Sequence, residues 1–217
     1  MKIQNITHFP EKFEGVLNTS MLWKAKDQGK ATYEYIDLRE FGIGPRRQVD
    51  DTPYGGGAGM LLKVEPLIEA IEKAKSVDPT AKVILPTPRG REYKQSDAKQ
   101  FAADDKGLIL ICPRYEGYDE RIMDWVDESY RVGNYVLTGG EIPAMLIIDS
   151  VVRLLPGVLG GETSAEIESF QQDDQNVEFP QYTRPEEFRS LKVPDVLLSG
   201  NHAAINAWRD EKSTRPD

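Results

Sequence analysis

The sequence predicts an α/β fold in which helices cover both faces of a parallel sheet. Three observations support this prediction. Apolar residues alternate with polar ones in some segments and recur at helical spacing in others. Strand-like and helix-like segments follow one another in turn, as in successive β-α-β units. The segment Gly107–Cys112 is apolar almost throughout, as expected of a strand buried on both faces.

The elements can be assigned in chain order. Ala31–Leu38 alternates like a half-buried strand, and Val64–Ala74 carries apolar residues at helical spacing. The alternation then continues through strand Lys82–Leu85, helix Gln95–Ala103, strand Gly107–Cys112, helix Asp119–Val126, strand Ser129–Val132 and helix Ile142–Leu155. Because Cys112 ends an apolar run, we expect a buried structural thiol rather than a nucleophile.

Length and composition indicate one main domain with a small appendage. The chain has 217 residues, of which 39% are hydrophobic and 29% charged, as in soluble globular proteins. No apolar run approaches the roughly 20 residues of a membrane span. The amino-terminal residues lack the features of a signal peptide, and one cysteine cannot form an internal disulfide. A cytoplasmic location is therefore expected.

The charge is unevenly distributed and suggests a domain boundary. The net charge of −9 argues against a nucleic-acid partner, but residues 1–160 hold 21 basic and 24 acidic residues, and residues 161–217 hold 6 and 12. Residues 161–180 contain six acids and no base, which is typical of a solvated linker. We therefore expect a first domain over 1–160, an acidic linker over 161–177 and a small second domain over 178–217.

Three segments rich in turn-forming residues follow predicted strands, where parallel sheets bind ligands. They are Pro86–Arg91, Pro113–Gly117 and Val132–Gly140. A fourth glycine cluster, Tyr54–Met60, matches neither the dinucleotide fingerprint nor the phosphate loop. It is better explained by backbone flexibility or by the close approach of another group.

Several long segments carry a resemblance to a known family. They are Val49–Met60, Arg114–Arg121, Gly133–Glu141, Ile148–Arg153, Leu155–Leu159, Tyr182–Pro185 and Leu198–His202. In order and spacing these segments resemble the TrmD family of bacterial tRNA (guanine-N1)-methyltransferases, which belong to the SPOUT methyltransferases. The similarity extends from about residue 6 to 209.

The resemblance implies both a fold and an activity. The fold is a SPOUT-type, trefoil-knotted parallel-sheet domain with a small helical carboxyl-terminal domain that binds tRNA. The family forms homodimers whose active sites lie between the subunits. Its enzymes transfer a methyl group from S-adenosylmethionine to N1 of the guanine at position 37, beside the anticodon. The partner would be the tRNA anticodon stem-loop, and Mg²⁺ is associated with the reaction, although no ligand set is visible.

The resemblance also implies a cofactor site in the three loops. The positions carried over are Pro88, Pro113, Tyr115, Glu116, Val132, Gly133, Asn134, Tyr135, Val136, Leu137, Gly139, Gly140 and Pro143. Glycine-rich backbone can approach an adenine and a ribose closely, and apolar side chains can enclose the ring. Pro113 stands where the family usually has glycine, which removes one N–H and predicts a rearranged loop.

The chemistry requires a carboxylate and a cation. Neutral guanine holds a proton on N1, so a base must remove it while negative charge moves to O6. Arg153 matches the family's catalytic arginine and could stabilise that charge; the alternative is an ordinary salt bridge. The family's aspartate before a Ser-Phe pair is Glu168 here. Glu168 is the first candidate for the base and Glu178 the second, and Asp173 and Asp174 are further alternatives.

Other residues are candidates for binding RNA. Asp50 could read a guanine edge, because a carboxylate accepts hydrogen bonds from N1–H and the exocyclic amine. Arg46, Arg47, Arg114 and Arg184 could contact phosphates, and Glu178 matches another acidic position of the family. His8 and His202, the only histidines, form no metal site by themselves and suggest structural hydrogen bonding. After Arg209 the chain is shorter than the family's usual sequence, so a less extensive grip on tRNA is expected.

Two alternatives remain open at this stage. One is a SPOUT methyltransferase that modifies another RNA position. The other is a module that binds cofactor or RNA but has impaired catalysis, because Glu168 and Pro113 depart from the family pattern.

Overall fold

A computed structural model describes residues 1–159, 169–170 and 176–213. Contacts between residues divide the chain into two compact units, Met1–Leu159 and Gly160–Asp217. Most of the predicted acidic linker, including Glu168, Asp173 and Asp174, lies outside the described residues. Each unit is described by itself below.

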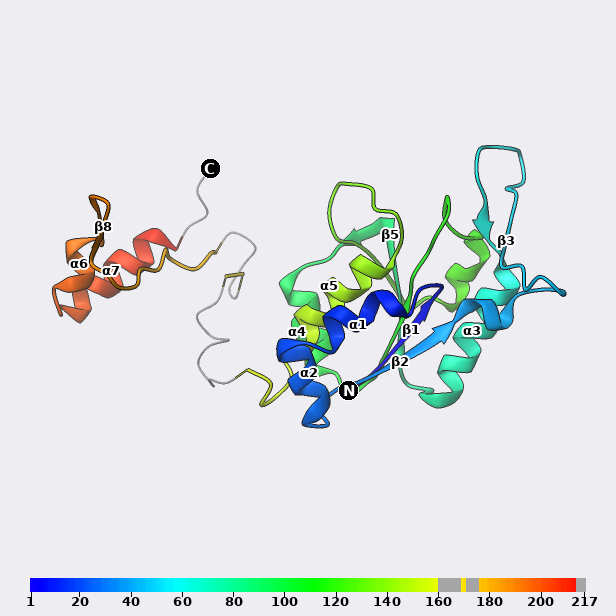
Figure 1. The fold of residues 1–217 in the computed structure, drawn as a ribbon, viewed down its shortest axis with the longest axis horizontal. Coiled ribbons are helices and arrows are strands. Elements are labelled where there is room, and N and C mark those ends of the chain that lie inside the picture. Colours follow the sequence, from blue (N-terminus) through cyan, green and yellow to red (C-terminus); the bar gives the residue numbers. More distant parts are fainter. Residues whose placement is uncertain (160–168, 171–175, 214–217) are drawn as a thin grey trace. The chain divides into compact units, whose positions relative to one another are not determined.

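The first unit is built on a five-stranded parallel sheet (Figure 1). Its strands lie in the order β2-β1-β6-β5-β7, and every neighbouring pair is parallel. The strands are β1 (Lys2–Thr7), β2 (Thr32–Asp37), β5 (Lys82–Glu92), β6 (Leu108–Ile111) and β7 (Glu128–Arg131). The predicted α/β class with a parallel sheet is confirmed.

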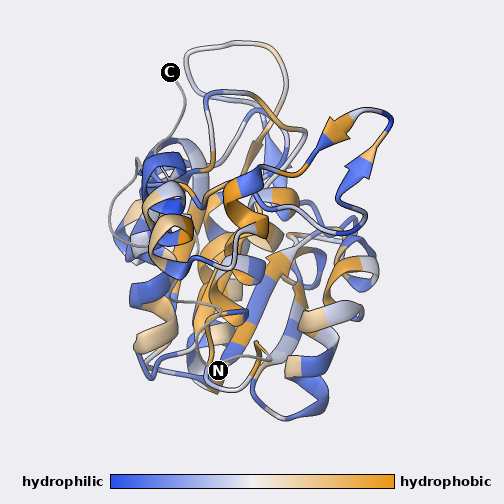
Figure 2. Cartoon of the chain, turned by 90° about the vertical axis from the view of Figure 1, so that its left-hand side faces the viewer, coloured by the Kyte–Doolittle hydropathy of each residue, from blue (hydrophilic) through white to orange (hydrophobic). Residues whose placement is uncertain are grey.

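Helices cover both faces of the sheet. On one side lie α1 (Glu11–Leu17), α2 (Ser20–Asp27), α4 (Gln95–Ala103) and α5 (Glu141–Val152), and on the other lies α3 (Val64–Val77), as Figure 1 shows. Alternation along β6 explains the two cores: Leu108 and Leu110 belong to the cluster under α4 and α5, and Ile109 and Ile111 to the cluster under α3. All four are buried, so the continuous apolar run serves both faces. The hydrophobic colour of the central strands in Figure 2 reflects this arrangement.

Several predicted elements have other bounds in the structure; α3, for example, continues to Val77, beyond the predicted Ala74. Three of the differences have a visible local cause. The predicted helix 119–126 is a 3₁₀ helix, η2 (Glu120–Trp125), in which Ile122 N–H donates to Asp119 O. The Asp119 carboxylate accepts from Arg121 N–H at 3.0 Å and so favours this tight turn. Helix α5 ends at Val152 instead of residue 155, because Pro156 disfavours helical backbone in the residue before it.

The third difference concerns the strand predicted to end at Leu85. Strand β5 continues to Glu92, but Tyr130 of β7 pairs with both Pro86 and Arg91. The residues between Pro86 and Arg91 therefore do not pair with β7. They form a loop within β5, at the position of the predicted 86–91 loop. Gly90 permits the strand to rejoin, because a Cβ there would lie 2.6 Å from Tyr130 C.

Sequence reasoning did not assign β1, α1 or α2. It also missed the 3₁₀ helix η1 (Leu38–Phe41) and the short antiparallel pair β3 (Asp50–Asp51) and β4 (Leu61–Leu62). Strand β1 holds Gln4, Asn5 and Thr7, which are buried in spite of their polarity. Gln4 donates to Ala74 O at 3.1 Å, and Asn5 to Glu34 O at 3.4 Å. The prediction for Cys112 is confirmed: the thiol is buried and unpaired, and burial raises its pKa.

The second unit is small. It contains a hairpin of β8 (Glu187–Phe188) and β9 (Leu191–Lys192), followed by α6 (Asp195–Leu198) and α7 (His202–Lys212). Asn201 caps α7, because its side-chain oxygen accepts from Ala204 N–H at 3.2 Å. Ile205 is buried, and Tyr182 and Trp208 pack with ring centroids 6.3 Å apart. The element content is helical with one added hairpin.

Candidate functional site

The first unit has a cavity of about 480 Å³ at the carboxyl ends of β5, β6 and β7, here called the loop cavity. The three predicted loops form its walls. Twelve of the thirteen predicted cofactor positions line it, and Asn134 does not: the twelve are Pro88, Pro113, Tyr115, Glu116, Val132, Gly133, Tyr135, Val136, Leu137, Gly139, Gly140 and Pro143. The fold thus brings together residues that are up to 55 positions apart, from 88 to 143.

Close backbone contact holds two of these loops together. Gly140 N–H donates to Pro113 O at 2.8 Å. A Cβ on Gly140 would lie 2.7 Å from Cys112 Cα and 2.8 Å from Pro113 N, so glycine is required there. Pro113 lacks an N–H, but its carbonyl is the group that anchors the neighbouring loop.

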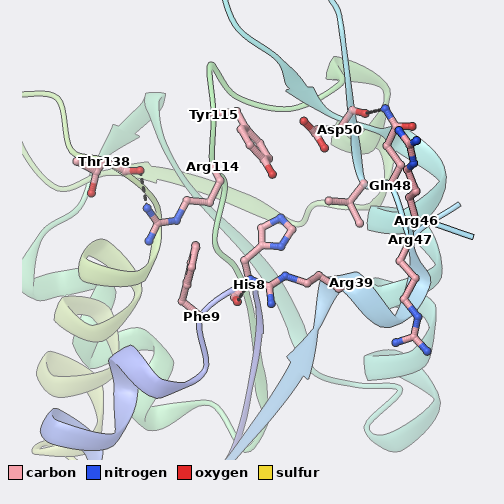
Figure 3. A pocket seen from close by; sticks show the side chains of 11 residues that line it. His8, Phe9, Arg39, Arg46, Arg47, Gln48, Asp50, Arg114, Tyr115 and Thr138 are labelled. Atoms are coloured by element: carbon pink, nitrogen blue, oxygen red, sulfur yellow. Dashed lines mark hydrogen bonds between the residues drawn. The ribbon is translucent and has the colours of Figure 1, made fainter.

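A second cavity of about 580 Å³, here called the arginine cavity and shown in Figure 3, shares lining residues with the first. Its lining includes the predicted RNA-binding residues Asp50, Arg46, Arg47 and Arg114. The other residues that line it are His8, Phe9, Arg39, Gln48, Val49, Tyr115 and Thr138. Of these, only Tyr115 was predicted from the sequence to lie in a binding site, that of the cofactor. Cationic side chains therefore surround a single carboxylate.

Asp50 lies on β3, where it pairs with Leu62 of β4. The side chain of Gln48 donates to Asp50 O at 3.0 Å and braces this edge. The Asp50 carboxylate and the Tyr115 ring face the same space in Figure 3. Burial raises the pKa of the Tyr115 phenol, and the negative charge of Asp50 adds to that shift.

Three residues, Arg114, Tyr115 and Thr138, line both cavities. Tyr115 has a φ of +61°, which is unusual for a residue with a side chain and is held by the surrounding loop. Arg114 is only 13% exposed and forms an ion pair with Glu141, with 2.7 Å between Nη2 and Oε2. Its guanidinium is thus already paired with a carboxylate, and a contact of Arg114 with phosphate stays a prediction.

His8 departs from the expected structural hydrogen bonding. The residue is 4% exposed and lines the arginine cavity, and its Nε2 has no hydrogen-bond partner among the described residues. Its ring meets Tyr115 edge-on, with centroids 6.0 Å apart. Burial lowers the pKa of His8, and the positive charge of Arg39 lowers it further.

The glycine cluster 54–60 contacts Glu116, a residue that lines the loop cavity. A Cβ on Gly59 would lie 2.5 Å from Glu116 Cγ, and Glu116 N–H donates to Met60 O at 3.0 Å. Gly59 also has a φ of +77°. Of the two explanations offered for the cluster, Gly59 thus fits the close approach of another group, which is the side chain of Glu116.

The proposed catalytic pair is not brought together in the described part of the chain. Arg153 stands at the carboxyl end of α5, is partly buried, and is not among the residues that line either cavity. Glu168 lies outside the described residues. In the second unit, the Ser169 hydroxyl accepts from Glu178 N–H at 2.9 Å, the Glu178 carboxylate accepts from Gln181, and Arg184 is exposed.

The described residues contain neither a cluster of metal-ligating side chains nor a helix that could span a membrane. No group of three or more His, Cys, Asp or Glu side chains there could hold a metal ion. Within the same residues, none of the helices has both the length and the apolar character to cross a bilayer.

The class of protein follows from the position of the two cavities. A parallel sheet with two cavities that share lining residues, one walled by glycine-rich backbone and the other by arginines, is typical of an α/β protein that binds ligands at the carboxyl ends of its strands. The family model of tRNA (guanine-1)-methyltransferase TrmD matches residues 1–216. The chain belongs to this family.

Individual relatives agree with that assignment. The chain is 50% identical over 216 residues to a tRNA (guanine-N(1)-)-methyltransferase of Geobacillus kaustophilus, covering 99% of this chain and 87% of the relative. It is 52% identical over 217 residues to the protein of the same name from Carboxydothermus hydrogenoformans, covering 98% and 83%. A crystal structure of the tRNA (m1G37) methyltransferase from Aquifex aeolicus is similar with a TM-score of 0.79 and 37% identity, covering 96% and 87% of the two chains.

Proposed function

We propose that this protein transfers a methyl group from S-adenosylmethionine to N1 of the guanine at position 37 of tRNA. Family membership and the names of the relatives support a tRNA (guanine-N1)-methyltransferase. The observation that carries the proposal for this chain is the shared wall of Arg114, Tyr115 and Thr138, because methyl transfer requires donor and acceptor in adjoining sites.

The loop cavity is the proposed site of the methyl donor. Its volume of about 480 Å³ lies within the range of roughly 300 to 1,000 Å³ for small-molecule sites. Tyr135, Val136 and Leu137 supply an apolar wall for a base, and exposed backbone of the glycine-rich loops supplies polar contacts. When bound, S-adenosylmethionine supplies an electrophilic methyl group on a sulfonium.

The arginine cavity is the proposed site of the target nucleotide. Asp50 accepts hydrogen bonds from a guanine edge, and Arg46 and Arg47 neutralise phosphates. A linker carboxylate, Glu168 first and Glu178 second, takes the proton from N1. Arg153 stabilises the charge on O6 while the N1 lone pair forms the new bond and the sulfur keeps the electrons of the broken one.

A dimer would explain how Arg153 and the linker reach the cavities. The family resemblance implies a homodimer with a trefoil-knotted first domain. Ile142 and Leu146 of α5 are 54% and 42% exposed, an apolar surface suited to a second copy. The second unit is the proposed tRNA-binding domain, with Arg184 among its contacts. The cytoplasmic location stays a prediction. Mg²⁺ also stays a prediction, and no step is assigned to it.

The decisive experiment uses tRNA transcripts with guanine or adenine at position 37. We expect radiolabelled methyl transfer only to the first transcript, with the product mapped to N1 by mass spectrometry. Methylation that ignored this replacement would indicate another RNA position and contradict the proposal. Binding of S-adenosylmethionine by calorimetry without turnover would indicate an impaired module. Equal turnover of Glu168→Gln and the parent protein, with loss in Glu178→Gln, would reassign the base.

A further inference from the structure

Glu141 is a buried carboxylate to which the proposed mechanism gives no role. It is the first residue of α5 and is 1% exposed. The Thr7 hydroxyl and Arg114 Nε each donate to Oε1 at 3.0 Å. Arg114 Nη2 lies 2.7 Å from Oε2. A buried carboxylate with three such contacts is fixed in place far more firmly than a surface ion pair.

The contacts of Glu141 join three separate segments. Thr7 ends β1, directly before His8 and Phe9 of the arginine cavity. Arg114 belongs to the loop after β6, and its Nη1 donates to Thr138 O at 2.9 Å in the loop before α5 (Figure 3). One carboxylate and its arginine partner thus link the end of β1, the loop after β6 and the loop before α5, each of which contributes residues to the cavities.

Arg114 is the partition between the cavities. It lines both of them, and its guanidinium lies over the Phe9 ring with 4.6 Å between Cζ and the ring centroid. A Cβ on Gly139 would lie 2.5 Å from Arg114 Nε, so the guanidinium packs directly against the backbone of this glycine. A shift of Arg114 would therefore move the common wall of both sites.

We propose that Glu141 is a positioning residue that fixes Arg114 as this wall and so sets the placement of the methyl donor relative to the target nucleotide. The inference rests on the proposed function, since it assigns one ligand to each cavity. Misplacement of reacting groups by about 1 Å can reduce a rate by roughly 100-fold. The effect should therefore appear in kcat more than in the affinity for either ligand.

The test compares Glu141→Gln with Asp97→Asn. Asp97 is a matched control, because it is 5% exposed, lies 2.7 Å from Arg91 Nη1 in an ion pair, and lines neither cavity. We expect Glu141→Gln to reduce kcat by roughly 100-fold and to change the Kd for S-adenosylmethionine by less than about threefold. Asp97→Asn should lower the Tm to a comparable extent and leave kcat within about twofold of the parent.

Thr7→Val provides a milder variant if Glu141→Gln does not fold. It removes one hydrogen bond and keeps the ion pair, so we expect a several-fold decrease in kcat at unchanged Kd, roughly the effect of one hydrogen bond. Unchanged kcat in Thr7→Val, or equal losses of kcat in Glu141→Gln and Asp97→Asn, would overturn the inference. The parent is assayed first: an inactive parent refutes the proposed function, whereas an active parent with an unaffected Glu141→Gln refutes only the positioning role.

Discussion

The two cavities adjoin one another but are built from different groups. The loop cavity is formed by backbone that approaches closely at Gly139 and Gly140, together with apolar side chains. The arginine cavity is formed by charged side chains around Asp50. We therefore expect shape to control binding in the loop cavity and charge to control binding in the arginine cavity. Substitutions and changes in salt concentration can distinguish these two modes of binding.

The largest effect is expected at Gly140. In Gly140→Ala the new methyl group would overlap the backbone of Cys112 and Pro113, so the loops must separate. We expect a loss of about 1 to 3 kcal/mol in stability and at least a tenfold weaker Kd for S-adenosylmethionine. Calorimetry and thermal denaturation measure both. Gly15→Ala in α1 is the control, since nothing lies within 4 Å of its Cβ position; equal losses there would contradict a steric cause.

Asp50→Ala should have the next largest effect, and only on the arginine cavity. Loss of hydrogen bonds to a charged acceptor costs about 1.5 to 3 kcal/mol, which corresponds to roughly a 10- to 150-fold lower kcat/KM for tRNA. The Kd for S-adenosylmethionine should stay the same. If the Kd for S-adenosylmethionine increased by the same factor by which kcat/KM for tRNA decreased, the two cavities would not bind their ligands independently.

Salt provides a smaller and more specific comparison. If Arg46 and Arg47 neutralise phosphates, Arg46→Ala and Arg47→Ala should each weaken tRNA binding several-fold. Each should also reduce the slope of log K against log salt concentration by about 0.7 to 1. Filter binding at several salt concentrations measures this slope. Arg89→Ala serves as a control, because Arg89 is 78% exposed but lines the loop cavity. A similar change of slope in Arg89→Ala would contradict a specific role of Arg46 and Arg47 in binding phosphates.

The smallest expected effect is a pH dependence of stability from His8. Its pKa is lowered in the folded protein by burial and by Arg39, so the unfolded chain binds more protons as the pH falls below about 6.5. The contribution of neutral His8 to the free energy of unfolding is therefore fully present above about pH 6.5, and it is lost as the pH falls through the lowered pKa of the folded protein. Urea unfolding between about pH 5 and 7.5 should therefore show a shallower decline in His8→Gln. Identical profiles of the parent and His8→Gln would contradict this contribution.

Much of the first unit could be predicted from local pattern. Helix Gln95–Ala103 is observed with the predicted bounds, and β6 differs by one residue at each end. The rule that parallel sheets bind ligands at carboxyl ends led to the loops of the loop cavity. Strand β1 was missed because its buried polar residues form hydrogen bonds with partners 29 to 134 residues away, which no local pattern shows.

The sequence by itself determined the class of fold, several of its central elements and the family, because apolar periodicity and long motifs are properties of neighbouring residues. Tertiary structure decided how the site is assembled. It brought the hydroxyl of Thr7 within hydrogen-bond distance of the carboxylate of Glu141, 134 residues away in the sequence. Arg114 Nε donates to the same carboxylate. The tertiary structure also added His8 and Arg39 to the arginine cavity. The contacts of Glu141 join the end of a strand, a loop and the first turn of a helix, and the relative positions of those segments are fixed only when the whole core forms.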